Sequence, residues 1–137
     1  MKWDKLLSPV RIRTLFGGPA SLRSAGDPRD EFERDYGRSI FSTPVRRLQD
    51  KAQVFPLEKH DAIRTRLTHS VEVSSVARGL TRSLAKWIHA ERRDLHEDQI
   101  QAIETIAATC GMIHDLGNPP FGHAGEKAIA QWFDKHF

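Results

Sequence analysis

Apolar side chains recur every three or four residues along much of the chain, and this spacing predicts a series of helices. Phe32, Tyr36 and Ile40 are four residues apart and predict a helix over residues 29–40. Ser42-Thr43-Pro44 then places a polar cap before a proline, which is typical of a new helix start. No clear strand pattern is present, so the fold class is predicted to be all-α.

A much longer helix is predicted over residues 65–92. Its apolar stripe, expected to face the core, consists of Val73, Val76, Leu80, Leu84, Trp87 and Ile88. His69 lies four residues before Val73, so it extends this stripe and should also face the core. A single histidine in such a position is usually a hydrogen-bonded core residue, so His69 alone does not indicate a site.

Two further helices complete the predicted bundle. Asp94 can cap a helix over residues 95–115 whose inward positions are Ile100, Ile103, Ala107, Cys110 and Ile113. His114 follows Cys110 by four residues and falls on the same inner face. A last helix starts near His123 and is expected to bury Ile129, Trp132 and Phe133.

The length of 137 residues, with 39% hydrophobic and 28% charged residues, indicates at most one domain. Turn residues in the segment 1–28 predict an irregular N-terminal arm, followed by a helical part over 29–137. The single cysteine, Cys110, excludes an internal disulfide framework. No apolar run approaches the ~20 residues of a membrane span and no secretory signal is evident, so we expect a cytoplasmic protein without membrane contact.

The segment from Met112 to Glu126 carries the strongest chemical signal. His114-Asp115 stands at the end of a helical pattern that Gly117 and the prolines after it interrupt, so the two side chains can converge. Together with His69 from another helix, they are predicted to bind a divalent metal, because coordination would compensate the burial of Asp115. Mn²⁺, Mg²⁺, Fe²⁺, Ni²⁺ and Zn²⁺ all suit these donors.

Basic and amide side chains add a candidate nucleotide site to a net charge of +3. The first basic cluster, residues 11–23, is interpreted as solvated surface. Guanidinium groups match phosphate oxygens, so the candidate phosphate ligands are Arg46, Arg47, Arg64 and Arg66, although a surface salt bridge explains each equally well. The helix that starts at Ser42 is expected to fade near Gln53, and one helical face could then present the amides of Gln49 and Gln53.

Three blocks in order resemble the HD-domain deoxynucleoside triphosphate triphosphohydrolases, of which dGTP triphosphohydrolase is the type member. They are Glu33–Pro44, Arg46–Pro56, and the run P-P-F-G-H-A-G-E after His114-Asp115. The resemblance implies an HD-domain helical bundle, of which residues 29–137 would be the N-terminal part. It also implies hydrolysis of deoxynucleoside triphosphates to deoxynucleoside and inorganic triphosphate with a divalent metal, Mn²⁺ or Mg²⁺ foremost, by a homo-oligomer.

The resemblance assigns roles to further residues. His123 would be catalytic and Glu126 would support it, whereas a simple helix cap is the alternative for Glu126. Gln53 with Val54 would lie against the sugar and help to exclude a 2′-hydroxyl group. A fourth metal ligand, a distant Asp in the family, does not appear before Phe137, so the chain alone can be inactive. Two positions differ from the pattern. Ala52 stands where the family often has a hydroxyl residue, and Asn118 stands where many HD proteins have His.

Two alternatives keep part of this interpretation. An HD phosphohydrolase could act on another nucleotide, although the block from Arg46 to Phe55 argues against it. The chain could also be a truncated, non-catalytic module that binds nucleotide or, weakly, single-stranded nucleic acid, or that serves in assembly. No DNA- or RNA-binding motif accompanies the basic residues.

Overall fold

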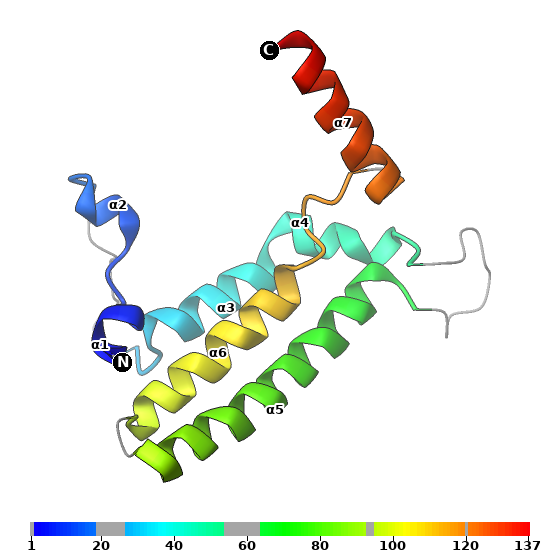
Figure 1. The fold of residues 1–137 in the computed structure, drawn as a ribbon. Coiled ribbons are helices and arrows are strands. Elements are labelled where there is room, and N and C mark those ends of the chain that lie inside the picture. The colour runs from blue at the N-terminus through cyan, green and yellow to red at the C-terminus, as the bar shows by residue number, and fades with distance from the viewer. Residues whose placement is uncertain (1, 19–26, 54–63, 93–94, 120) are drawn as a thin grey trace.

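The computed structural model describes residues 2–18, 27–53, 64–92, 95–119 and 121–137, and within them it is built from helices alone (Figure 1). In chain order the elements are α1 (Trp3–Leu6), α2 (Ile12–Leu15), α3 (Glu31–Phe41), α4 (Thr43–Arg46), the 3₁₀ helix η1 (Arg47–Asp50), α5 (Arg66–Arg92), α6 (Glu97–Ile113) and α7 (His123–His136). The one extended pairing among the described residues is an isolated antiparallel bridge between Ala52 and Thr65. The predicted all-α class is confirmed.

A capping box defines the start of α3. The Asp30 carboxylate accepts a hydrogen bond from the Glu33 N–H at 2.7 Å, and the Glu33 carboxylate accepts one from the Asp30 N–H at 3.2 Å. These two bonds satisfy backbone donors that the first turn leaves without a helical partner. The helix predicted over 29–40 is therefore confirmed with a shift of about two residues.

Helices α5 and α6 lie side by side and form the centre of the fold (Figure 1). They approach each other closely at Gly111, where an added Cβ would lie 2.7 Å from the Ser74 Cα. Ser74 fills this contact without leaving its hydroxyl unpaired, because its Oγ donates to the Ala108 carbonyl at 2.8 Å. Small residues thus let the two backbones come together.

The predicted inward stripe of α5 is wrong for four of its six residues. The side chains of Val76, Leu80, Leu84 and Trp87 are 55–68% exposed. The buried face carries small residues instead, namely Ser70, Ser74 and Ala85. Close helix packing favours small side chains, so the larger apolar residues of α5 lie on its other side.

Helix α6 also differs from its prediction at both ends. Its N-cap is His96, whose N–H donates to Gln99 Oε1 at 2.9 Å, and Asp94 lies outside the described residues. Ile100 is buried as predicted, but Cys110 is exposed and Ile113 is 37% exposed. The interpretation of Cys110 as a core residue is therefore wrong, since Gly111 and Met112 occupy the buried side of this turn.

The N-terminal arm contains two short helices and is held against the bundle. Trp3 packs on the buried cluster of Ala85, Leu95 and Ile100. Arg11 donates to Glu31 Oε2 at 2.8 Å and to Asp35 Oδ1 at 2.7 Å. These hydrogen bonds raise the pKa of Arg11, and the bond to Asp35 has the largest effect. The interpretation of the first basic cluster as solvated surface is wrong for this arginine, which ties the arm to α3.

Helix α7 leads away from the α5–α6 pair (Figure 1) and has no buried residue. Ile129, Trp132 and Phe133 are 49–53% exposed, so their predicted burial is wrong. The Trp132 ring contacts its own helix instead, with ring centroids 5.1 Å from Phe133 and 4.6 Å from His136. The spacing indicated an apolar face, but no other element covers that face in the described residues.

Candidate functional site

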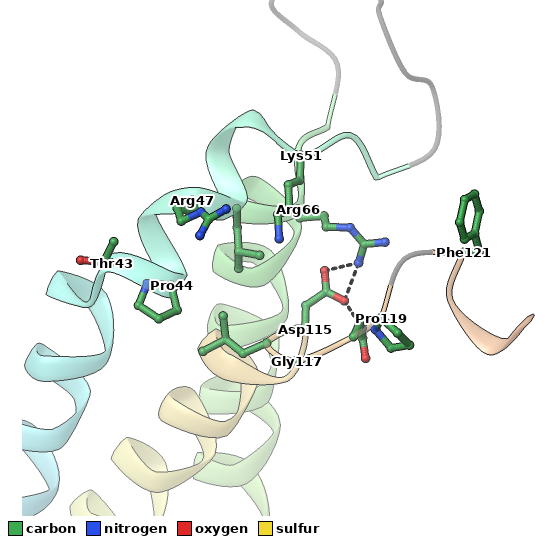
Figure 2. Close-up of a pocket in the computed structure, with 12 residues that line it drawn as sticks. Thr43, Pro44, Arg47, Lys51, Arg66, Asp115, Gly117, Pro119 and Phe121 are labelled. Carbon is green, nitrogen blue, oxygen red and sulfur yellow. Dashed lines mark hydrogen bonds and ion pairs between the residues drawn. The ribbon is translucent and has the colours of Figure 1, made fainter. Parts of the chain in front are cut away.

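A cavity of about 570 Å³ opens where the α5–α6 pair meets α4 and η1 (Figure 2). Its wall comes from three separate stretches of chain, and the lining residues are Thr43, Pro44, Arg47, Leu48, Lys51, Arg66, Asp115, Leu116, Gly117, Asn118, Pro119 and Phe121. Val45 and Leu48 are both 2% exposed and anchor the first of these stretches in the core. The volume is in the range of small-molecule sites.

Asp115 lines this cavity and is almost fully buried. Arg66 donates through Nη1 to both of its carboxylate oxygens, at 2.8 and 2.7 Å, and Asn118 Nδ2 donates to Oδ1 at 2.6 Å (Figure 2). An ionised carboxylate needs such partners when it leaves water. Asn118, which departs from the common HD pattern, is thus a direct partner of Asp115.

His69 of α5 and His114 after α6 come together, as predicted from their positions in the sequence. Their ring centroids are 5.2 Å apart with an interplanar angle of 74°. His114 Nδ1 lies 2.8 Å from the Gly111 carbonyl oxygen. Because a carbonyl only accepts, Nδ1 carries a proton in this contact, and in the neutral ring Nε2 would then have the lone pair that a metal needs.

The two histidines fit a shared metal ion better than Asp115 does. Two imidazoles bound to one ion at the usual nitrogen distance of ~2.1 Å have ring centres roughly 5 Å apart, close to the separation found. Asp115, in contrast, is held by Arg66 and Asn118. Across the described ranges no three His, Cys, Asp or Glu side chains are grouped so that they could hold a metal. The full ligand set of His69, His114 and Asp115 remains a prediction.

The turn after α6 explains how these residues reach the cavity. The helix ends at Ile113, His114 is its C-cap, and Gly117 adopts a positive φ of 86°. That conformation suits glycine because it has no Cβ. The predicted break at Gly117 is found as a left-handed turn, although the helix itself ends about two residues earlier than predicted, at Ile113.

His123 and Glu126 form the pair that their spacing predicts. His123 Nδ1 lies 3.0 Å from Glu126 Oε2 in the first turn of α7. The His123 side chain is 95% exposed, and neither residue lines the cavity. The pair is thus formed without being placed at the site, and its catalytic role remains a prediction.

The four candidate arginines divide into two groups. Arg47 and Arg66 line the cavity. Arg46 is exposed and is not among the lining residues, while Arg64 forms an exposed ion pair with Glu72 at 2.8 Å. The salt-bridge explanation therefore suits Arg64 in this structure, and the phosphate explanation suits Arg47.

The amides of Gln49 and Gln53 do not share a helical face, which corrects that prediction. The 3₁₀ helix η1 ends at Asp50, and Lys51 has extended backbone angles. Gln49 is exposed, whereas Gln53 is partly buried and its Oε1 accepts no hydrogen bond within the described structure. Val54 lies outside the described residues.

Sequence reasoning missed Lys51 and Phe121 as cavity residues. Both lie within blocks that carry the family resemblance, but helical periodicity does not describe the backbone at either position. Lys51 follows a 3₁₀ helix, and Phe121 has a positive φ of 67°, which is uncommon for an aromatic residue. Its side chain is 91% exposed at the rim of the cavity.

None of the described helices combines the length and apolar composition needed to cross a membrane.

Sequence comparison shows which known proteins the chain resembles. The HD domain family model matches residues 66–137, more than half of the chain and the part that contains His69, His114 and Asp115. A deoxyguanosinetriphosphate triphosphohydrolase-like protein of Listeria monocytogenes is 47% identical over 97% of the chain. A protein of the same description from Synechocystis is 44% identical over 100% of it, and a deoxyguanosinetriphosphate triphosphohydrolase of Yersinia enterocolitica is 39% identical over 92%.

The chain spans only 28%, 30% and 26% of the lengths of these three relatives, respectively. The matched segment nevertheless includes both histidines whose rings meet, together with the buried Asp115 that follows the second of them. The chain therefore belongs to the HD domain family.

Proposed function

We propose that this chain forms part of the active site of a metal-dependent hydrolase of deoxynucleoside triphosphates, with dGTP as the first substrate to test. The products would be the deoxynucleoside and inorganic triphosphate. The observation that carries the proposal is the meeting of His69 and His114, of which His114 precedes Asp115 in the chain. Neither histidine lines the cavity, but Asp115 does, together with Arg47, Lys51 and Arg66. The names of the relatives from Listeria and Yersinia support the choice of substrate.

His69, His114 and Asp115 are the residues that would hold the metal, Mn²⁺ or Mg²⁺ in the first instance. A bound divalent metal would supply Lewis-acid polarisation of a phosphate and would lower the pKa of a bound water. The Nδ1 proton of His114, directed at the Gly111 carbonyl, leaves Nε2 available to the ion. Asp115 would have to exchange part of its contact with Arg66.

The other residues of the proposed site act on charge and protons. Arg47 and Arg66 would neutralise phosphate charge, with Arg46 and Arg64 as outer contributors. Gln49, Gln53 and Val54 would contact the nucleoside. His123 would transfer protons at its exposed Nε2, while Glu126 fixes its tautomer through Nδ1. Homo-oligomer formation and a cytoplasmic location remain predictions.

Product analysis tests the proposal. Protein incubated with Mn²⁺ and dGTP should release deoxyguanosine and intact inorganic triphosphate. Reversed-phase chromatography would detect the deoxyguanosine, and ³¹P NMR would detect the triphosphate. A His114→Ala variant, prepared in parallel, controls for contaminating phosphatases and should release neither product. Orthophosphate or pyrophosphate as the only inorganic product would contradict the proposal.

A second candidate is nucleotide binding without turnover by this chain. It is favoured by the position of His123, whose side chain is 95% exposed and is not part of the cavity lining. Saturable dGTP binding in calorimetry, with no deoxyguanosine formed over the same period, would support this candidate. Turnover that depends on His123 would exclude it.

A further inference from the structure

We infer that Lys51 and Arg47 form an anion-binding subsite that takes the outer phosphates of a triphosphate group. This inference deepens the proposed function and rests on it for the choice of ligand. Lys51 was not among the candidate phosphate ligands in the sequence, yet it lines the same cavity as Arg47 and Arg66. Figure 2 draws its side chain between those of the two arginines.

Backbone hydrogen bonds determine where Lys51 lies. Its N–H donates to the Leu48 carbonyl at 3.3 Å, and its own carbonyl accepts from the Arg66 N–H at 2.9 Å. The next residue, Ala52, pairs with Thr65 in the antiparallel bridge. These contacts join the end of η1 to the first residue of α5, so the backbones of two cavity cations are held together whatever ligand is present.

The charges in the cavity are unequally compensated. Arg66 is neutralised by Asp115, at 2.7 Å. Arg47 and Lys51 form no ion pair with any residue that the structure describes, although both line the cavity. Two positive charges therefore remain without a protein counterion on one wall. Polyphosphate supplies several negative charges within a few ångströms, which suits such a pair.

The site favours a compact polyphosphate over a nucleic-acid strand. The cavity has a volume of about 570 Å³, and its lining includes the buried carboxylate of Asp115. Its cations come from η1, from the residue after it and from the start of α5. A strand-binding surface would instead need a basic groove that follows a backbone, with aromatic side chains on which successive bases stack. The cavity has one aromatic lining residue, Phe121, among those described.

Binding of inorganic tripolyphosphate tests the subsite without turnover. Calorimetric titrations would use the full chain in metal-free buffer. We expect about tenfold weaker binding for Lys51→Gln and for Arg47→Gln, as for the loss of one charge-assisted hydrogen bond. Lys51→Arg, which keeps the charge, should bind within about twofold of the unaltered protein. The matched control is Lys127→Gln on exposed α7, which should bind as the unaltered protein does.

Several outcomes would overturn the subsite. Tripolyphosphate could fail to bind, could bind equally well to Lys51→Gln, or could lose the same affinity in the Lys127→Gln control. An oligothymidylate that bound in a Lys51-dependent way while tripolyphosphate did not would also reject it, in favour of a nucleic-acid strand. Circular dichroism of each variant would establish that it is folded, and the exposed Lys51 side chain should not alter the spectrum.

The subsite and the proposed function can fail separately. Lys51-dependent tripolyphosphate binding without hydrolysis of dGTP would support the subsite and contradict the enzyme proposal. Hydrolysis of dGTP with unchanged tripolyphosphate binding in Lys51→Gln would do the reverse.

Discussion

Arg66 at the start of α5 holds both carboxylate oxygens of Asp115 after the end of α6, at 2.8 and 2.7 Å. The two residues are 49 positions apart in the chain, so this ion pair closes one end of the central helix pair. It also joins two residues with different proposed roles, a phosphate ligand and a metal ligand. The pair therefore connects the stability of the fold to the chemistry of the site.

Removal of Arg66 should destabilise the protein because it leaves a buried carboxylate with only Asn118 as its partner. We expect Arg66→Gln to lower the free energy of unfolding by about 2–3 kcal/mol, measured by urea titration. The control, Arg64→Gln, breaks the exposed pair with Glu72 and should cost less than about 1 kcal/mol. An equal loss of unfolding free energy in the two variants would show that the buried pair stabilises the fold no more than the exposed pair does.

Substitution of Gly111 tests the close approach of α5 and α6. A Cβ there would lie 2.7 Å from the Ser74 Cα, so Gly111→Ala should destabilise the protein by about 1–3 kcal/mol through overpacking. Gly79→Ala is the matched control, because its Cβ would meet nothing within 4 Å in helix α5. That control should be neutral or stabilising by up to ~1 kcal/mol. Thermal unfolding would measure the Tm of both variants. A shift of Tm in the same direction for both would contradict this packing.

The paired histidines should determine metal affinity. His69→Ala and His114→Ala are each expected to weaken Mn²⁺ binding by more than about tenfold, measured by electron paramagnetic resonance of the free ion. His136→Ala removes an exposed histidine on α7 and should leave the affinity unchanged. Mn²⁺ binding that survives the loss of either ring would contradict the assignment of the metal to this pair.

His123 should affect turnover rather than binding. If it transfers protons as proposed, His123→Ala should lower kcat for dGTP by about 10²- to 10⁴-fold, while calorimetric dGTP affinity changes little. Glu126→Gln keeps a hydrogen-bonding group near Nδ1 and should have a smaller effect on kcat. A parallel loss of binding and turnover in His123→Ala would instead indicate a structural role.

The carboxyl group of Asp27 should titrate well below its usual range. Hydrogen bonds from the Arg29 side chain and backbone lower its pKa from 3.8 to about 2. Because the folded-state pKa is the lower one, its contribution to stability is present above about pH 4 and is lost as the pH falls towards 2. NMR titration should give this midpoint, and Arg29→Gln should raise it. An unchanged titration midpoint in Arg29→Gln would exclude Arg29 as the cause of the low pKa of Asp27.

Helix positions followed from local patterns because spacing, caps and breakers act within a few residues. The helix predicted over 65–92 is found at Arg66–Arg92, and the break at Gly117 is found as a left-handed turn. The order of motifs also predicted that His69 and His114 would meet, and their rings do so. The predicted inner-face position of His114 is wrong, because His114, like Cys110 four residues before it, is exposed.

Which face of each helix is buried depended on the partner that covers it, and spacing does not contain that information. Helix α5 has large apolar residues such as Leu80 on one side and small residues such as Ser74 on the other, and contact with Gly111 selected the small side. The cavity depended in the same way on contacts between distant segments. The Lys51 carbonyl accepts a hydrogen bond from the Arg66 N–H, and this contact places Lys51 at the cavity. The side chain of the same arginine forms the ion pair with Asp115. Local sequence determined the helices and the reactive residue types, while packing between helices determined which side chains face one another.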